Sequence, residues 1–98
     1  MAGLRFEWDG KKASSNARKH GVSFEEAETV FSDENALLLE DPGHSESEER
    51  FVLLGLSAAL RVIVVSHVCR EEDAVIRIIS ARRATARERT EYRHRWSS

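Results

Sequence analysis

Three apolar segments in the second half of the chain, joined by short connections, constrain its fold more than any other feature. They read RFVLLGLS (50–57), RVIVVSHVC (61–69) and AVIRIISA (74–81). Runs of this length and composition, bounded by turn residues, are typical of β-strands. The connections 58–60 and 71–73 are too short for the crossover that parallel strands need. The sequence therefore predicts an antiparallel meander of three strands.

The N-terminal part of the chain predicts one short strand and two helices. In LRFEW (4–8) apolar and charged residues alternate, which indicates a half-buried strand. Asp9 is a good N-cap for a helix over residues 10–20, which Gly21 ends. A second helix is expected over residues 24–31, whose apolar side chains recur on one face.

The segment NARKHGVSFEEA, between these two helices, has both a structural and a chemical interpretation. Gly21 suits the left-handed conformation that ends a helix, and Ser23 with Glu26 has the spacing of a capping box. Lys19 and His20 then lie in the last helical turn, where the helix dipole favours positive charge. Helix termination does not require a lysine followed by a histidine. On this interpretation the segment is mainly a hinge between two helices. If the pair acts on an anionic ligand, we expect it to hold a phosphate or to donate a proton, with Lys19 as the main contact.

The rest of the chain completes an α+β pattern. NALLLED (35–41) predicts a further strand, PGHSESEE (42–49) predicts a loop, and a charged C-terminal helix is expected from Arg82 onward. The element order is therefore β-α-α-β-β-β-β-α. We expect a single domain over residues 1–98, with the helices packed on one side of a mostly antiparallel sheet.

Composition and charge exclude several classes of protein. The longest apolar run is far shorter than the ~20 residues that span a bilayer. Cys69 is the single cysteine, so we expect no internal disulfide and a cytoplasmic location. The four histidines lie far apart in the sequence, and no Cys/His pattern predicts a metal site. The net charge of −2 hides an asymmetry, because residues 23–50 carry ten acidic groups and one arginine. The chain can therefore present an acidic face and a basic face at once.

One register of the predicted meander places several charged side chains together. It assumes a three-residue turn at 71–73 and a two-residue turn at 58–59. His67 then lies opposite both Arg50 and Arg77, on the face away from a dry core. The same face carries two further arginines that lie opposite each other, Arg61 and Arg83. A slip of one residue would scramble this row, so the row depends on both turn lengths.

Three blocks of the sequence resemble a known family. FEWDGKKASSNARKHGVSFEEAETVF, DPGHSESEERFVLLGLS and IRIISARRATARERTEYRH look like the BrnT family of small toxins from bacterial type II toxin–antitoxin systems. The resemblance covers most of the chain and departs in the turn SAALR, where such proteins typically have a glycine. It implies a RelE-like fold, ribonuclease activity without a metal or other cofactor, and neutralisation by a BrnA antitoxin. BrnA-type antitoxins carry a ribbon-helix-helix domain, so operator DNA is expected to be bound only through the antitoxin.

Metal-free RNA cleavage proceeds by attack of the 2′-OH on the adjacent phosphorus. It needs a base near that hydroxyl, positive charge on the non-bridging oxygens and an acid at the leaving 5′-oxygen. Arginine holds phosphate through its planar fork, and histidine titrates near neutrality, so both residue types suit these roles. The candidate catalytic residues are Arg61, His67, Arg77, Arg82 and Lys19, and the candidate RNA-binding residues are Arg83, His20 and Arg50.

Structural alternatives accompany these candidates. His67 interrupts a run of β-branched residues, but it can also be a sheet histidine with a structural hydrogen bond. The strand arginines can simply be exposed. Arg82 and Arg83 open the predicted last helix, where the macrodipole disfavours cations, so an anion nearby would explain them. His44 lies in an acidic loop that should repel RNA, so contact with a basic partner or simple solvation is the better expectation.

Two other functions stay open. An inactivated toxin, kept as a subunit of a repressor complex, would bind an antitoxin without cleaving RNA. Binding of double-stranded DNA by this chain alone has little support, because its net charge is −2 and no helix-turn-helix or ribbon-helix-helix pattern is present.

Overall fold

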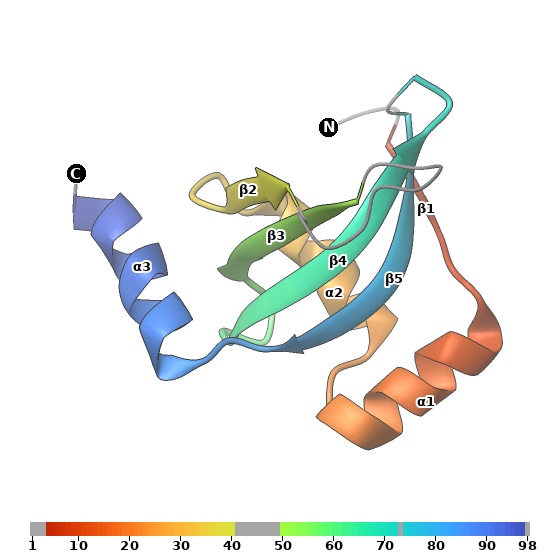
Figure 1. Ribbon diagram of the computed structural model, residues 1–98, viewed down its shortest axis with the longest axis horizontal. Coiled ribbons are helices and arrows are strands. Elements are labelled where there is room, and N and C mark those ends of the chain that lie inside the picture. Colours follow the sequence, from red (N-terminus) through yellow and green to blue (C-terminus); the bar gives the residue numbers. More distant parts are fainter. Residues whose placement is uncertain (1–3, 41–49, 73, 98) are drawn as a thin grey trace.

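The computed structural model of the chain describes residues 4–40, 50–72 and 74–97 (Figure 1). Its elements are β1 (Arg5–Glu7), α1 (Gly10–His20), α2 (Phe24–Thr29), the 3₁₀ turn η1 (Val30–Ser32), β2 (Leu37–Glu40), β3 (Phe51–Leu56), β4 (Val62–Arg70), β5 (Val75–Arg83) and α3 (Ala86–Ser97). The predicted α+β class and the predicted order of strands and helices are confirmed.

The five strands form one sheet in the order β1-β5-β4-β3-β2. Strands β2 to β5 are an antiparallel meander, as the short connections predict, whereas β1 pairs parallel to β5. Strand β1 is short and covers only Val75, Ile76 and Arg77 of β5. Among the described residues, the outer edge of β5 beyond Arg77 therefore has no strand partner, and α1 lies along this part of β5 (Figure 1).

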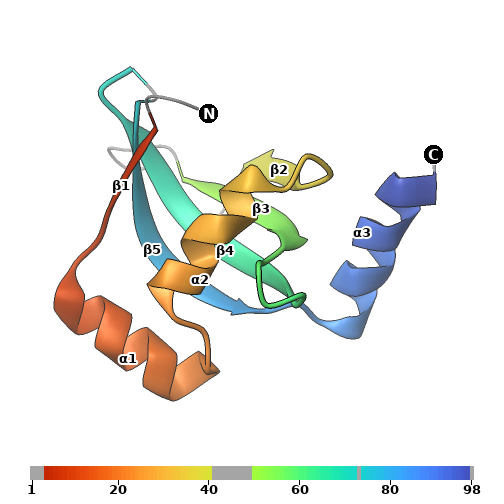
Figure 2. The same ribbon diagram turned by 180° about the vertical axis from the view of Figure 1, so that it is seen from behind.

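The helices lie on both sides of the sheet. Helices α1 and α2 cover one face, and Figure 2 shows α2 in front of the sheet. Together with the inward side chains of β3, β4 and β5, they enclose the main core. The buried residues of this core are Val22, Phe24, Ala27, Val30, Leu53, Ile63, Val65, Ile76, Ile78 and Ala81. Helix α3 instead packs its Tyr92 with Leu54 and Val64 on the other face. The prediction that all helices lie on one side is wrong. Strands β3 and β4 carry apolar side chains on both faces, so both faces of the sheet are covered by helices.

The helix ends follow the predicted signals. The Asp9 carboxylate accepts a hydrogen bond from the backbone N–H of Lys11 at 3.0 Å, and Gly21 has the left-handed φ of 70°. The Ser23 hydroxyl accepts one from the backbone N–H of Glu26 at 3.0 Å. The capping box is nevertheless only half formed, because the Glu26 carboxylate turns toward Arg61 instead of back to Ser23.

Both turns of the meander are one residue longer than predicted. The backbone N–H of Ser57 donates to the carbonyl of Arg61 at 2.8 Å, which closes a three-residue loop over 58–60. Arg70 pairs with Val75, so the next loop holds four residues. Each added residue shifts the register by one. A β-bulge on β5, where Ile79 is the extra residue opposite Ser66 and His67 of β4, then shifts it once more.

Leu60 in the β3–β4 loop is in the left-handed conformation, with φ of 63°, and its side chain is 79% exposed. A β-carbon makes this conformation costly, whereas glycine adopts it freely. We therefore expect Leu60→Gly to raise the free energy of unfolding by roughly 0.5–1 kcal/mol. Thermal or urea unfolding measures this change. Leu60→Ala keeps the β-carbon and should change stability little, and a less stable glycine variant would contradict the prediction.

Candidate functional site

His67 lies inside the main core. Its side chain is 1% exposed, and its ring centroid lies 4.9 Å from that of Phe31 and 6.2 Å from that of Phe51. Its strand partners are Phe51 and Ile78, not Arg50 and Arg77, so the predicted Arg50–His67–Arg77 row is wrong. The physical reason is the length of the two turns. Burial lowers the pKa of His67. The contact of Nδ1 with the Val65 carbonyl, at 3.2 Å, raises the pKa but does not outweigh the effect of burial.

Helix α1 is a wholly basic surface. Its eleven residues, GKKASSNARKH, include no acid, and its basic side chains are exposed: Lys11, Lys12, Arg18, Lys19 and His20. Lys19 and His20 lie in the last turn, as predicted. Within the part of the chain that the structure describes, neither side chain makes an ion pair or a hydrogen bond. Both are therefore available to an anionic ligand.

Asn16 attaches α1 to the sheet. Its Nδ2 donates to the carbonyl oxygens of Val22 at 2.9 Å and Ala81 at 2.8 Å, and its Oδ1 accepts from the Ala81 N–H at 3.1 Å. These bonds satisfy the backbone of β5 at the edge that β1 does not reach. Asn16 is not among the residues predicted from the sequence, although an asparagine in the middle of a helix is intrinsically unfavourable and indicates a specific partner.

A shallow groove of about 190 Å³ runs between α1 and the edge of β5. One wall carries the basic side chains of Lys12, Lys19 and His20. The other wall is formed by Ile79 and Ser80, where the bulge interrupts the regular pairing of β5 with β4. Such bulges redirect side chains at the edges of sheets and occur beside functional sites. The groove combines positive charge, a hydroxyl and an apolar side chain, which a nucleotide can contact.

Arg61 lies next to the end of α1, and Arg83 lies near Glu26 of α2. Arg61 donates from Nη2 to the Gly21 carbonyl at 3.0 Å and from Nε to a Glu26 oxygen at 3.0 Å. Arg83 is exposed and near enough to Glu26 to help lower the pKa of that carboxyl, after the larger effect of the Arg61 hydrogen bond. Arg83 pairs with Ile63, so it lies diagonal to Arg61 and not opposite it as predicted.

Arg77 and Arg82 lie elsewhere and are held by carboxylates. Arg77 Nη1 lies 3.2 Å from an oxygen of Glu7. Both terminal nitrogens of Arg82 contact Glu88, at 2.9 and 3.0 Å, and this fork is the main cause that lowers the pKa of Glu88 to about 2. A phosphate would have to displace Glu7 or Glu88 to bind either arginine through these nitrogens.

The predicted position of Arg82 and Arg83 at the start of the last helix is wrong. Both residues end β5. The helix begins after a capping box in which the Thr85 hydroxyl accepts from the Glu88 N–H at 3.1 Å and the Glu88 carboxylate accepts from the Thr85 N–H at 2.8 Å. Arg50 precedes β3 and is half-buried, at the opposite end of that strand from the loop that leads to Arg61. His44 lies outside the described residues.

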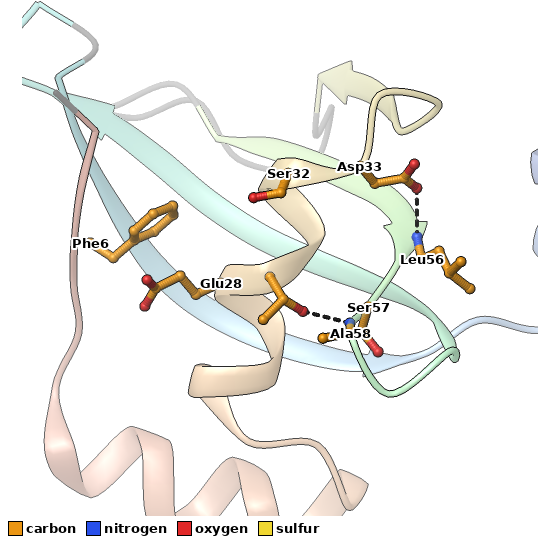
Figure 3. A pocket seen from close by; sticks show the side chains of 8 residues that line it. Phe6, Glu28, Ser32, Asp33, Leu56, Ser57 and Ala58 are labelled. Atoms are coloured by element: carbon orange, nitrogen blue, oxygen red, sulfur yellow. Dashed lines mark hydrogen bonds between the residues drawn. The ribbon is translucent and has the colours of Figure 1, made fainter. Parts of the chain in front are cut away.

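The surface over α2 and η1 has the opposite charge. Residues 21–40 contain six acidic groups and no Lys, Arg or His. A hollow of about 520 Å³ lies on this side. Figure 3 shows side chains that line it, among them Phe6, Glu28 and Asp33. The Asp33 carboxylate accepts a hydrogen bond from the Leu56 N–H at 2.8 Å and another from the Tyr92 hydroxyl. Burial raises the pKa of Asp33, but its hydrogen bonds together outweigh this effect, so the pKa is lowered. Phosphate is not expected to bind here, because the acidic groups repel it.

Two further kinds of feature, metal sites and membrane-spanning helices, are not found in the described ranges. Within them, no three His, Cys, Asp or Glu side chains are grouped so that they could hold a metal ion. No helix in the same ranges is long and apolar enough to cross a membrane.

Comparison with known proteins decides the family. The profile of the family described as "Ribonuclease toxin, BrnT, of type II toxin-antitoxin system" matches residues 8–88, which is 81 of the 98 residues. The chain belongs to the BrnT family. The recognition made from the three sequence blocks is thereby confirmed. A search of curated protein sequences gives no significant match.

A solved structure supports the fold of this BrnT chain. The crystal structure of the Brucella abortus ribonuclease toxin BrnT is 23% identical in sequence, with a TM-score of 0.63. The alignment covers 84% of this chain and 97% of that one. At this identity the match shows the shared α+β fold, and a RelE-like label is compatible with it. Membership in the family makes this chain a ribonuclease toxin of the type II class, which implies an RNA target and a protein antitoxin.

Proposed function

We propose that this BrnT chain cleaves RNA without a metal ion, by attack of a 2′-OH on the adjacent phosphorus, at the end of α1. The observation that carries this assignment is the exposure of Lys19 and His20, which are free of partners in the described part of the chain and lie beside the groove along β5. Arg83, also exposed and without an ion pair there, lies on the same side of the sheet.

Each residue of the proposed site has a role that its chemistry supports. Lys19 and Arg83 supply positive charge to the non-bridging phosphate oxygens. His20 transfers a proton, either from the attacking hydroxyl or to the leaving 5′-oxygen, because an imidazole titrates near neutral pH. Ser80 and Ile79 in the groove contact the adjoining ribose or base. His67 has no role in this proposal, since RNA does not reach a side chain that is 1% exposed.

The first test uses the purified chain and single-stranded RNA in the presence of EDTA. We expect cleavage to persist in EDTA, and His20→Ala to reduce its rate by about 10²–10⁴-fold, the usual contribution of an acid–base group. Lys19→Ala and Arg83→Ala should each weaken activity by roughly tenfold or more, through the loss of a charge-assisted bond. Arg18→Ala is the matched control, because Arg18 is an exposed cation of α1 that does not line the groove. Full activity of the His20 and Lys19 variants would overturn the assignment.

The same cleavage assay is applied to alanine variants of three further arginines, Arg77, Arg82 and Arg50. We propose them as more distant contacts along the RNA, since the carboxylates of Glu7 and Glu88 already occupy Arg77 and Arg82. Their replacement by alanine should raise KM less than replacement of Lys19. If Arg77→Ala or Arg82→Ala abolishes cleavage while Lys19→Ala does not, the active site lies on the other face of the sheet.

The proposed partner is a BrnA-type ribbon-helix-helix antitoxin, which also binds the operator DNA. Its support is the type II class of the family. We place the toxin in the cytoplasm, where the RNA substrate is found. Co-expression with such an antitoxin should relieve the growth arrest that the toxin causes. If the pure chain binds the antitoxin but cleaves no RNA and arrests no growth, it is an inactivated toxin that serves as a repressor subunit.

A further inference from the structure

The Arg61 guanidinium is largely occupied by protein acceptors. Its Nε donates to Glu26 Oε2 at 3.0 Å, and its Nη2 donates both to Glu26 Oε1 and to the Gly21 carbonyl, the latter at 3.0 Å. Three of its five N–H donors are therefore used. Because Glu26 takes the Nε–Nη2 edge, this edge is closed to a phosphate.

Glu26 is a fixed anchor for Arg61. Its side chain is 13% exposed, and it also accepts a hydrogen bond from the Ser57 hydroxyl at 2.6 Å. Glu26 occupies the capping-box position of α2, yet its carboxylate binds Ser57 and Arg61, which flank the loop between β3 and β4. The Arg61–Glu26 pair thus joins the start of α2 to the sheet.

The two residues that follow His20 are held from separate directions. Arg61 holds the carbonyl of Gly21, and Asn16 holds the carbonyl of Val22 at 2.9 Å. Gly21, with φ of 70°, sets the direction of the chain just after the last turn of α1. Fixing its carbonyl therefore fixes the end of α1, whose last turn carries Lys19 and His20.

We infer that Arg61 is a positioning residue that acts through Gly21 and Glu26, and that it does not bind RNA. The inference rests on the proposed function, since the groups that Arg61 positions are Lys19 and His20. Small displacements of a reacting group lower the rate of a chemical step far more than they lower binding. Loss of Arg61 should therefore appear in kcat.

The first experiment compares Arg61→Ala with Lys19→Ala in RNA cleavage at several salt concentrations. A residue that contacts phosphate contributes to the salt dependence of binding, so its loss lowers the slope of log KM against log salt by about 0.7 for single-stranded RNA. We expect this lower slope for Lys19→Ala. For Arg61→Ala we expect an unchanged slope and a kcat lowered by about 10–100-fold. An Arg61→Ala slope that falls as it does for Lys19→Ala would make Arg61 an RNA contact and overturn the inference.

A double-mutant cycle with Glu26→Ala tests the path of the effect. If Arg61 acts through Glu26, the double variant should lose hardly more kcat than Arg61→Ala alone. Independent, multiplicative losses would contradict this. Arg61→Lys keeps the charge but offers one point donor instead of a fork, so its kcat should lie between those of wild type and Arg61→Ala. It also provides a folded variant if the alanine variant is unstable.

NMR separates failure of this inference from failure of the proposed function. Arg61→Lys should shift the Gly21 amide and the His20 ring resonances of the free protein, whereas Arg18→Lys, the matched control, should not. If Arg61→Lys leaves both resonances and kcat unchanged, Arg61 positions nothing. If these resonances shift but His20→Ala and Lys19→Ala cleave RNA at the wild-type rate, the contact is real and the proposed active site is wrong.

Discussion

Replacement of Asn16 by alanine is expected to lower the free energy of unfolding by about 3 kcal/mol. The side chain is 7% exposed and makes three hydrogen bonds to backbone groups of Val22 and Ala81. Its removal leaves these groups without a partner, and each unsatisfied buried group costs roughly 1–3 kcal/mol, less where water enters. In the part of the chain that the structure describes, no strand replaces the lost partner, because β1 ends opposite Arg77.

Urea and thermal unfolding measure the effect of Asn16→Ala. For a chain of this size the expected loss corresponds to a fall in Tm of more than about 10 °C. Ser14→Ala, at an exposed position of the same helix, is the matched control and should change Tm little. Asn16→Asp should also be destabilising, since a carboxylate oxygen would replace the Nδ2 that donates to two carbonyls. A Tm within 2–3 °C of wild type for Asn16→Ala would mean, by the same scaling, that α1 does not depend on this contact.

The stability of the protein is expected to fall as pH falls below about 6.5, the ordinary pKa of histidine. Burial lowers the pKa of His67 in the folded state, so the unfolded chain binds a proton more readily than the folded one. The stabilisation is complete above the unfolded pKa and is lost as pH falls from there toward the folded pKa. One proton gives a slope of at most about 1.4 kcal/mol per pH unit.

Unfolding by urea between pH 5 and 8 tests the role of His67. His67→Gln is expected to be less stable than wild type at pH 8, because it disturbs the contacts with Phe31 and Phe51, but its stability should vary less with pH in this window. The carboxylates act at lower pH. The pKa of Glu88 is about 2, so its contribution is lost only below pH 4.5. A wild-type slope that persists in His67→Gln would assign the effect to another group.

The sequence predicted the fold through strong local signals. The apolar runs around 50–81 and their short connections predicted the meander, and Asp9, Gly21 and Ser23 predicted where α1 and α2 begin and end. These signals act within a few residues, so no tertiary contact was needed to interpret them. The three family blocks likewise predicted the family that the profile match over residues 8–88 shows.

The site was less predictable, because it depends on register. A three-residue loop at 58–60, a longer loop after Arg70 and a bulge at Ser66/His67 each move side chains relative to their neighbours. The pattern of apolar residues does not fix these lengths, since β3 and β4 are apolar on both faces. His67 therefore enters the core instead of joining a row of arginines.

By itself the sequence determined the α+β class, the order of the elements, the family and the basic character of α1. Only the tertiary structure decided which cations are available. It pairs Arg77 and Arg82 with carboxylates, ties Arg61 to Glu26 and Gly21, and leaves Lys19, His20 and Arg83 exposed beside the sheet. The physical reason is that helix signals and strand composition are local, whereas the partner of a charged side chain is set by contacts between residues far apart in the chain.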